Sequence, residues 1–405
     1  MASFVKEYID YKTIPIALAL AVFGLVSIYS ATYDAQMSEV TYKQLIWAGV
    51  GTAVMCIVAL TPLRMLQRLS YPAYFLSLLL LASVLLLGKT VSGSTSWFNF
   101  GTLRFQPSEF AKITTVLAIA MYLARNDVSL RKVKDLAVVG SMVIIPVVLI
   151  LKQPDTGTAI IYFGMLFPVL YWGGATRFTL LAIVAPLVAA IAALFGTTPF
   201  LISVIVLGTL LYLTKEHRIV AAIVFSVTVL VGISVQSIYS GLKPYQQKRI
   251  DTFLDPAADP QGAGYNVLQS KVAIGSGGFF GKGYLHGTQT QLNFIPEQWT
   301  DFIFCVPGEE FGFFGSTIVL VLFMGLLLRG ITIASSVKTP YGSLVALGVT
   351  AIFATHVFIN IGMSLGLLPV IGVPLPFLSY GGSAMITNMA MVGLLANLHA
   401  HRKEY

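Results

Sequence analysis

Long apolar segments separated by short polar turns follow one another along almost the whole chain. About twelve of them are long enough, or nearly so, to cross a hydrocarbon layer of about 30 Å. They cover residues 13–31, 42–60, 71–88, 108–124, 136–151, 157–172, 178–195, 199–214, 218–238, 302–328, 342–366 and 376–398. Two of these segments, 136–151 and 199–214, are short for a crossing. The pattern therefore predicts an all-α, polytopic transmembrane bundle of about 10–12 helices.

Composition supports this class and sets the orientation. Of the 405 residues, 56% are hydrophobic and 10% are charged, which is atypical of soluble globular proteins. The first apolar segment lacks a small-residue cleavage site, so we expect a retained helix rather than a signal peptide. The net charge of +8 comes mainly from alternate loops, which carry Arg64, Arg68, Arg125, Arg131, Lys132, Lys134, Arg177, Lys215, Arg218, Arg329, Lys338, Arg402 and Lys403. The positive-inside rule makes these loops and both termini cytoplasmic, and a nucleic-acid partner is not expected.

Two polar segments on the opposite, external side interrupt this pattern. Residues 89–106 mix aromatic side chains with Gly, Ser and Thr, a composition suited to the membrane interface. The second segment, about 239–300, is long for a loop without structure of its own, so we expect it to be partly ordered. Short helices are predicted at about 244–254 and 264–275, followed by a glycine-rich stretch.

Asp301 is the most informative single residue. It lies where this long polar loop runs into the apolar segment 302–328. A charge in the hydrocarbon region costs roughly 2.5 to 3.5 kcal/mol on insertion scales, so a carboxylate at such a boundary needs a structural or chemical reason. Asp301 is therefore a candidate for chemistry.

Other charged residues sit at predicted helix starts. Pro107 and Glu109 open the helix that follows residue 106, and Lys112 lies three residues after Glu109 on the same face. This spacing fits a helix cap with an intrahelical ion pair, and the alternative is an acid and a cation lining a hydrophilic cavity. Asp155 is placed to cap the helix predicted at 157–172, or to add a third charge to that cavity.

The last external segment is rich in Gly and Pro from residue 362 to residue 382. Such a composition permits a broken or re-entrant backbone, and close helix packing through small residues is the alternative. His356, just before this segment, has no second His or Cys at metal-ligand spacing. We interpret it as a packed core histidine rather than a zinc ligand.

Taken together, these motifs closely resemble the SEDS family of bacterial membrane glycosyltransferases, and its elongation branch more than its division branch. The resemblance rests on Gln106-Pro107-Ser108-Glu109, Gln153 to Thr158, Asp255-Pro256, Gly264-Tyr265, Gln269-Ser270-Lys271, Ala273 to Gly278, Gly281-Lys282-Gly283, Leu285 to Gln289, Pro296-Glu297, Thr300-Asp301-Phe302 and Ser379 to Ser383. The chain departs from the family in two places. A two-helix insertion at about 196–238 would raise the usual ten helices to twelve, and Ser96 stands where relatives often carry Arg.

The resemblance implies a single membrane domain over residues 1–405 that polymerises lipid II, an undecaprenyl-pyrophosphate-linked disaccharide-pentapeptide, for cell elongation and rod shape. The reaction would occur at the outer face of the bacterial cytoplasmic membrane. The implied partners are a class B penicillin-binding transpeptidase and other membrane proteins of the elongation complex. A lipid flippase and a scaffold that activates the transpeptidase are the alternatives.

The resemblance also assigns roles to residues. Asp301 matches the family's catalytic aspartate, while Glu109, Lys112 and Asp155 match polar positions of its central cavity. Lys112, Arg104, Lys271 and Lys282 are candidates for holding the departing pyrophosphate, with Mg or Mn as a divalent cation that bridges acidic groups and phosphate. Glu297, Ser379 and Ser383 lie in the matched motifs and are further cavity candidates.

Overall fold

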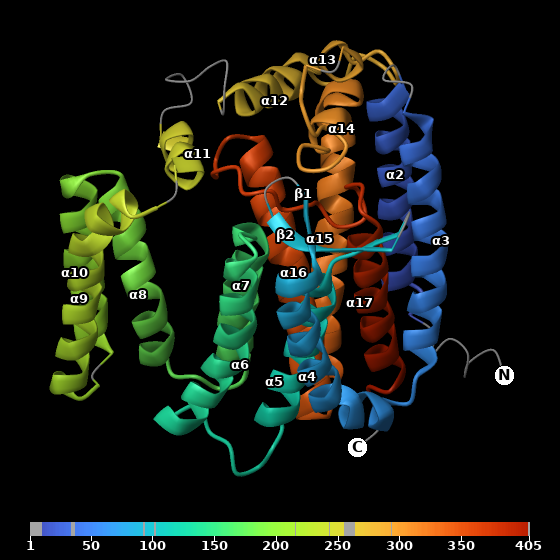
Figure 1. The fold of residues 1–405 in the computed structure, drawn as a ribbon. Coiled ribbons are helices and arrows are strands. Elements are labelled where there is room, and N and C mark those ends of the chain that lie inside the picture. Colours follow the sequence, from blue (N-terminus) through green and yellow to red (C-terminus); the bar gives the residue numbers. More distant parts are fainter. Residues whose placement is uncertain are drawn as a thin grey trace. The chain divides into compact units, whose positions relative to one another are not determined.

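The computed structural model describes residues 10–33, 37–91, 94–100, 103–214, 216–242, 244–254, 264–292 and 294–403. Helices dominate these residues, as predicted (Figure 1). The chain folds as two compact units. Unit 1 comprises Met1–Val128, Ala137–Val169 and Tyr265–Tyr405, and unit 2 comprises Ser129–Leu136 and Leu170–Gly264.

The predicted polytopic bundle is confirmed. Within the described residues, eight helices are long and apolar enough to cross a membrane: α2 (Thr13–Tyr33), α3 (Ser38–Leu60), α4 (Leu63–Leu87), α6 (Val133–Lys152), α8 (Arg177–Leu194), α10 (Arg218–Ser240), α15 (Gly312–Ser336) and α16 (Pro340–Ser364). Two further apolar helices, α7 (Thr156–Trp172) and α9 (Thr197–Leu213), are shorter. The remaining predicted segments correspond to α5 (Pro107–Leu123) and α17 (Gly382–Ala400).

Three helices begin at residues that differ clearly from the prediction. α4 begins at Leu63, eight residues before the predicted start at 71. The segment 302–328 begins with turns and a short helix, α14 (Cys305–Glu310), and the backbone breaks before α15, where Gly312 has φ +62°. A side chain at Gly312 would collide with the backbone of Gly281, which explains the glycine. The segment 376–398 becomes helical only at Gly382, because the preceding proline-rich residues form turns that are buried in the protein.

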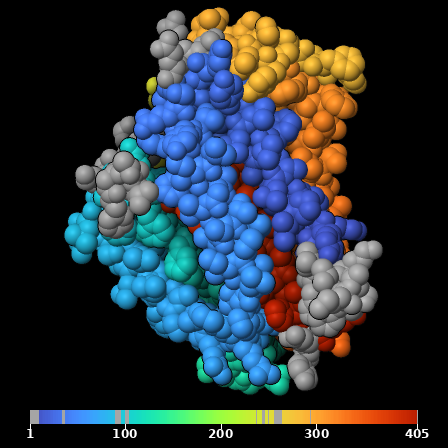
Figure 2. All heavy atoms as spheres, turned by 90° about the vertical axis from the view of Figure 1, so that its right-hand side faces the viewer, coloured from blue at the N-terminus to red at the C-terminus, as the bar shows by residue number. Residues whose placement is uncertain are grey.

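The core of unit 1 is built around its last two long helices. α16 packs between α15 and α5, and α17 packs against α3 and α2. Figure 2 shows α2 and α3 on one face of the molecule, with atoms of α17 visible between them. Small residues allow the close approach: a side chain at Gly393 of α17 would meet the backbone of Met55 in α3.

A small antiparallel sheet precedes α5, which the sequence did not predict. Its strands β1 (Lys89–Val91), β2 (Ser94–Phe100) and β3 (Leu103–Phe105) pair in the order β1-β2-β3. Phe98 pairs with Phe105 and Asn99 with Arg104. Since β3 runs directly into α5, the sheet fixes where that helix begins.

The long polar loop is partly ordered, as expected. The predicted short helices are α11 (Pro244–Leu254) and α12 (Tyr265–Ser276), and a single turn, α13 (Thr288–Gln291), follows the glycine-rich stretch. α12 packs against α14 and α16. Asp255 and Pro256 of the matched motifs lie outside the described residues.

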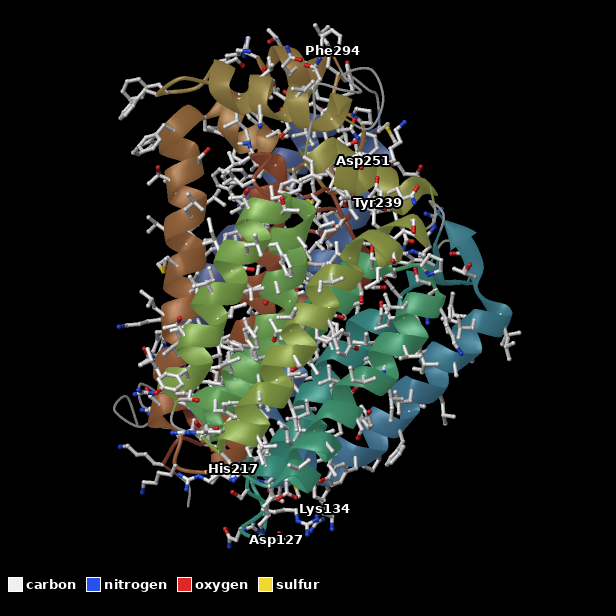
Figure 3. The ribbon with its side chains drawn as sticks, turned by 90° about the vertical axis from the view of Figure 1, so that its left-hand side faces the viewer. Asp127, Lys134, His217, Tyr239, Asp251 and Phe294 are labelled. Carbon is white, nitrogen blue, oxygen red and sulfur yellow. The ribbon has the colours of Figure 1, made fainter. Side chains whose placement is uncertain are left out.

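Unit 2 consists mainly of α8, α9, α10 and α11. α10 packs against α8 and α9, and Ala185, Ala189 and Leu207 form a small core. His217 and Tyr239 lie near the two ends of α10, and Tyr239 donates its hydroxyl to Asp251 (Figure 3). The single-domain organisation with an insertion at 196–238 stays a prediction.

Candidate functional site

Asp301 lies half-buried in the turns between α13 and α14. Its carboxylate rests against Gly372, where the Cβ of any side chain would lie 3.3 Å from Asp301 Oδ2. Gly372 also has φ +72°, a left-handed conformation that favours glycine. Both observations make glycine the fitting residue beneath this carboxylate.

The turn that carries Asp301 is shaped by Glu297. The Glu297 carbonyl accepts a hydrogen bond from the Thr300 N–H at 3.1 Å, and its carboxylate Oε2 accepts one from the Thr300 hydroxyl at 3.0 Å. Glu297 itself has φ +57°, which is uncommon for a residue with a side chain and costs on the order of 1–3 kcal/mol. The side chain of this exposed residue thus holds the turn that presents Asp301.

The segment before α17 clamps the same turn from the other side. The Ser379 hydroxyl donates to the Thr300 carbonyl at 2.6 Å and accepts from the Leu375 N–H at 2.7 Å. The next residue, Tyr380, donates its N–H to the Trp299 carbonyl at 2.8 Å. The Ser379 hydroxyl therefore braces the turn, because it both donates and accepts a hydrogen bond within the protein.

Two side chains of α16 complete the support. The Asn360 amide donates to the Asp301 carbonyl and to the Val373 carbonyl, each at 2.8 Å. One turn earlier, His356 contacts the Pro374 carbonyl through Nδ1 at 3.0 Å. The interpretation of His356 as a packed core histidine is confirmed, because its side chain is 4% exposed and bonded through both ring nitrogens.

Glu109 and Lys112 form the predicted ion pair within α5. Lys112 Nζ lies 2.8 Å from Glu109 Oε1, and the two side chains are 5% exposed or less. Lys112 Nζ also lies 2.9 Å from His356 Nε2. The pair is thus linked to α16, and its role in a substrate cavity stays a prediction.

Asp155 caps α7 as predicted and also reaches α5. Its carboxylate accepts from the Thr158 N–H at 3.0 Å and from the Gln106 amide at 3.0 Å. Desolvation by burial raises the pKa of Asp155, and the hydrogen bonds from Thr158 oppose that shift. The Gln106 N–H in turn donates to the Ser383 hydroxyl at 3.1 Å, and this hydroxyl donates to the Arg104 carbonyl at 3.1 Å. The starts of α5, α7 and α17 meet at Gln106.

The four cationic candidates have different surroundings. Lys112 is buried and paired with Glu109. Lys282 Nζ, in the long polar loop, lies 2.8 Å from Glu309 Oε1 of α14 and forms an ion pair with it. The Lys271 side chain is exposed and lies over Gly366, and the Arg104 side chain is exposed beside a cavity. The structure therefore holds Lys112 and Lys282 with carboxylates and leaves Arg104 and Lys271 exposed.

This cavity, of 450 Å³, is bounded mainly by α3, α5 and α17. Its lining is largely apolar and includes Trp47 and Phe110, with Arg104, Ser383 and Thr387 as polar members. Its volume falls within the usual range for small-molecule sites, about 300–1,000 Å³.

Sequence reasoning missed the two acids of α14. Glu309 is fully buried and accepts the backbone N–H groups of Gln289 and Thr290, at 2.8 and 3.0 Å. Its pKa is lowered, since these bonds and Lys282 outweigh the opposing desolvation. Glu310 accepts from Ser30 and Gln291. Two adjacent acids within an apolar, glycine-rich segment were the available signal.

Comparison with known proteins decides the family. The model of the FtsW/RodA/SpoVE family, described as "Cell cycle protein", matches residues 11–206 and 195–404. The chain belongs to this family. It is 37% identical to the peptidoglycan glycosyltransferase MrdB of Escherichia coli K12, over 98% of this chain and 95% of that protein. It is 34% identical to the peptidoglycan glycosyltransferase RodA of Treponema pallidum, over 97% and 98%.

Solved structures agree with this assignment. A chain from the structural study "Structural coordination of polymerization and crosslinking by a peptidoglycan synthase complex" is 29% identical, with a TM-score of 0.76 over 98% of this chain and 99% of that one. The rod shape-determining protein RodA of Thermus thermophilus is 26% identical, with a TM-score of 0.66 over 98% of each chain. The FtsW/RodA/SpoVE chain described here is therefore a multi-pass membrane protein with the RodA fold.

Proposed function

We propose that this chain is a peptidoglycan glycosyltransferase that polymerises lipid II on the outer face of the bacterial cytoplasmic membrane, in support of cell elongation and rod shape. The supporting observation is a half-buried carboxylate, Asp301, on a turn braced by Asn360 and Ser379. The activities named for MrdB of Escherichia coli and RodA of Treponema pallidum point the same way. The basic loops support cytoplasmic termini.

In the proposed reaction, Asp301 is the general base. It takes the proton from the 4-hydroxyl of the incoming lipid II while that oxygen attacks the anomeric carbon of the growing chain. The bond from this carbon to pyrophosphate breaks, the configuration inverts, and undecaprenyl pyrophosphate leaves. A positioned base contributes typically about 10²–10⁴-fold in rate. The brace on the Asp301 turn keeps this base in place during the transfer.

The substrate's other parts have matching surroundings. We propose that the prenyl chain lies in the apolar cavity between α3, α5 and α17, because its lining is apolar and its volume is 450 Å³. Arg104, exposed beside that cavity, is then placed to hold the pyrophosphate, with Lys271 as a second exposed cation. Lys112 and Lys282 would serve less directly, since each already neutralises a carboxylate.

A divalent cation fits this scheme only together with the substrate. Among the residues that the structure describes, no three His, Cys, Asp or Glu side chains gather closely enough to hold a metal by themselves. Mg²⁺ is usually bound by one or two carboxylates plus substrate phosphates. In that case Asp301 would contribute one carboxylate oxygen to Mg or Mn and keep the other as the base, and the cation would supply positive charge that stabilises the leaving pyrophosphate.

The decisive experiment incubates lipid II with detergent-solubilised protein, with and without its class B transpeptidase and with a chelator. No leaflets exist in this assay, so long glycan products indicate an enzyme rather than a flippase. Asp301→Asn should abolish polymerisation while the protein stays folded. The matched control is Asp127→Asn, because Asp127 is an exposed carboxylate paired with Arg125 on a distant loop. Full activity of Asp301→Asn would remove this residue from the mechanism.

A further inference from the structure

His356 joins two parts of the site that are far apart in the sequence. Its Nε2 lies 2.9 Å from Lys112 Nζ of α5, and its Nδ1 lies 3.0 Å from the Pro374 carbonyl of the segment before α17. The imidazole is 4% exposed. Both ring nitrogens are therefore used inside the protein, and neither is available to bulk water.

The chemistry of the two partners defines which form of the ring fits. A lysine ammonium has only donors, so His356 Nε2 must accept with its lone pair. A carbonyl has only acceptor sites, so His356 Nδ1 must carry the proton and donate it to Pro374. The neutral tautomer with hydrogen on Nδ1 satisfies both contacts at once.

The segment that His356 contacts at Pro374 also contacts Asp301. Pro374 follows Val373, whose carbonyl accepts from the Asn360 amide, and the same amide donates to the Asp301 carbonyl. Two residues before Pro374, Gly372 lies against the Asp301 carboxylate. His356 and Asn360 are four residues apart on α16 and so share one helix face. Residues 372–374 are thus held by this face at two consecutive carbonyls.

We propose that His356 is a positioning residue for the catalytic carboxylate. As the neutral Nδ1–H tautomer it fixes residues 372–374 relative to the Glu109–Lys112 pair, and through Gly372 and Asn360 it sets where the Asp301 carboxylate stands. The inference rests on the proposed function of Asp301 as the base. A misplacement of about 1 Å can cost on the order of 10²-fold in rate, so this support matters for catalysis.

Three substitutions separate the two links. His356→Asn keeps an amide donor at the place of Nδ1, His356→Gln keeps an acceptor at the place of Nε2, and His356→Leu keeps neither. We expect His356→Leu to lower kcat for lipid II polymerisation by about 10- to 100-fold, with KM for lipid II changed less than about twofold. His356→Asn should recover most of kcat, because the bond to Pro374 positions Asp301, and His356→Gln should stay close to His356→Leu.

The controls distinguish a failure of this inference from a loss of stability and from a failure of the proposed function. Thr355→Val is the matched variant, since its hydroxyl donates within α16 to the Ala351 carbonyl, and it should keep wild-type kcat. The ¹⁵N shifts of the His356 ring report the Nδ1–H tautomer without any activity. A folded His356→Leu protein with kcat within twofold of wild type, equal kcat of the Asn and Gln variants, or a ring protonated on Nε2 would overturn the inference. An inactive wild-type protein would instead overturn the proposed function.

Discussion

α16 and α10 look alike in sequence but differ in structure. Their most apolar windows have mean hydropathy 2.0 and 2.3, yet 72% of the window is buried in α16 and 17% in α10. Two polar side chains from each helix illustrate the difference. In α16, His356 and Asn360 bond to residues of other elements, whereas in α10 the hydroxyls of Thr228 and Ser234 bond to carbonyls of their own helix. Hydropathy locates both helices, and burial together with the partners of these polar side chains distinguishes them.

The physical reason is the cost of a polar group in an apolar medium. A Thr or Ser hydroxyl can satisfy itself within its own helix, as on α10, and then requires no neighbour. An imidazole or a primary amide has more donors and acceptors than its own helix can satisfy. Such a residue constrains the segments that pack around it, which is how α16 orders the turn of Asp301.

The largest effect on stability is expected from the ion pair that α16 contacts. Lys112→Met leaves Glu109 buried without its cation, which should destabilise the protein by about 3–5 kcal/mol. Thermal unfolding of the solubilised protein measures this change. The double variant Glu109→Gln with Lys112→Met should recover part of the loss, because no charge is then buried. An unchanged melting temperature of Lys112→Met would contradict the buried pair.

Asn360→Leu tests α16 itself. The substitution removes the donor shared by the Asp301 and Val373 carbonyls, which should cost about 2 kcal/mol of stability. We also expect polymerisation to fall at least about tenfold, since Asp301 loses its support. Thr350→Val on the same helix is the control, because its hydroxyl donates to its own helix at Ala346. Equal activity of the two variants would argue against a supporting role of Asn360.

A smaller effect is expected from the pH dependence of stability at the Lys282–Glu309 pair. The folded pKa of Glu309 is lowered from its ordinary value of 4.5, so its stabilising contribution is complete above about pH 4.5 and is lost as the pH falls through the folded pKa. Glu309→Gln should therefore lower the melting temperature at pH 7 and have less effect at pH 3.5. If the difference in melting temperature between the wild-type protein and Glu309→Gln grew as the pH fell, its sign would contradict this prediction.

The smallest effect is expected on α10. Ser234→Ala removes an exposed hydroxyl that bonds within the helix, and the free energy of unfolding should change by no more than about 0.5 kcal/mol. Polymerisation should stay at the wild-type rate. A large loss of activity would show that α10 contributes to the site and would remove the contrast with α16.

Much of the architecture could be predicted because each signal is local. Apolar runs located the helices, the spacing of three placed Glu109 beside Lys112, and Asp155 preceded its helix as a cap should. The boundary of polar loop and apolar segment drew attention to Asp301. Each of these features depends on residues a few positions apart, so a single sequence contains the information.

The support around Asp301 could not be predicted in the same way. His356 meets a lysine 244 residues away, Ser379 meets a carbonyl 79 residues away, and Asn360 meets one 59 residues away. Which helices bring such residues together depends on the packing of the whole bundle. The small sheet was missed for a related reason, since its adjacent Trp97 and Phe98 break the alternation that would have indicated a strand.

The junction at Gln106 has a consequence for biogenesis. Gln106 lies 49 residues before one of its partners, Asp155, and 277 residues before the other, Ser383. At roughly 5–20 residues per second, the ribosome delivers the second partner tens of seconds after the first. The rim where α5, α7 and α17 begin therefore cannot close until the last membrane helix has been inserted. A nascent chain halted before that point would keep these polar groups exposed, where the cell's quality-control proteases and chaperones can distinguish it from the finished protein.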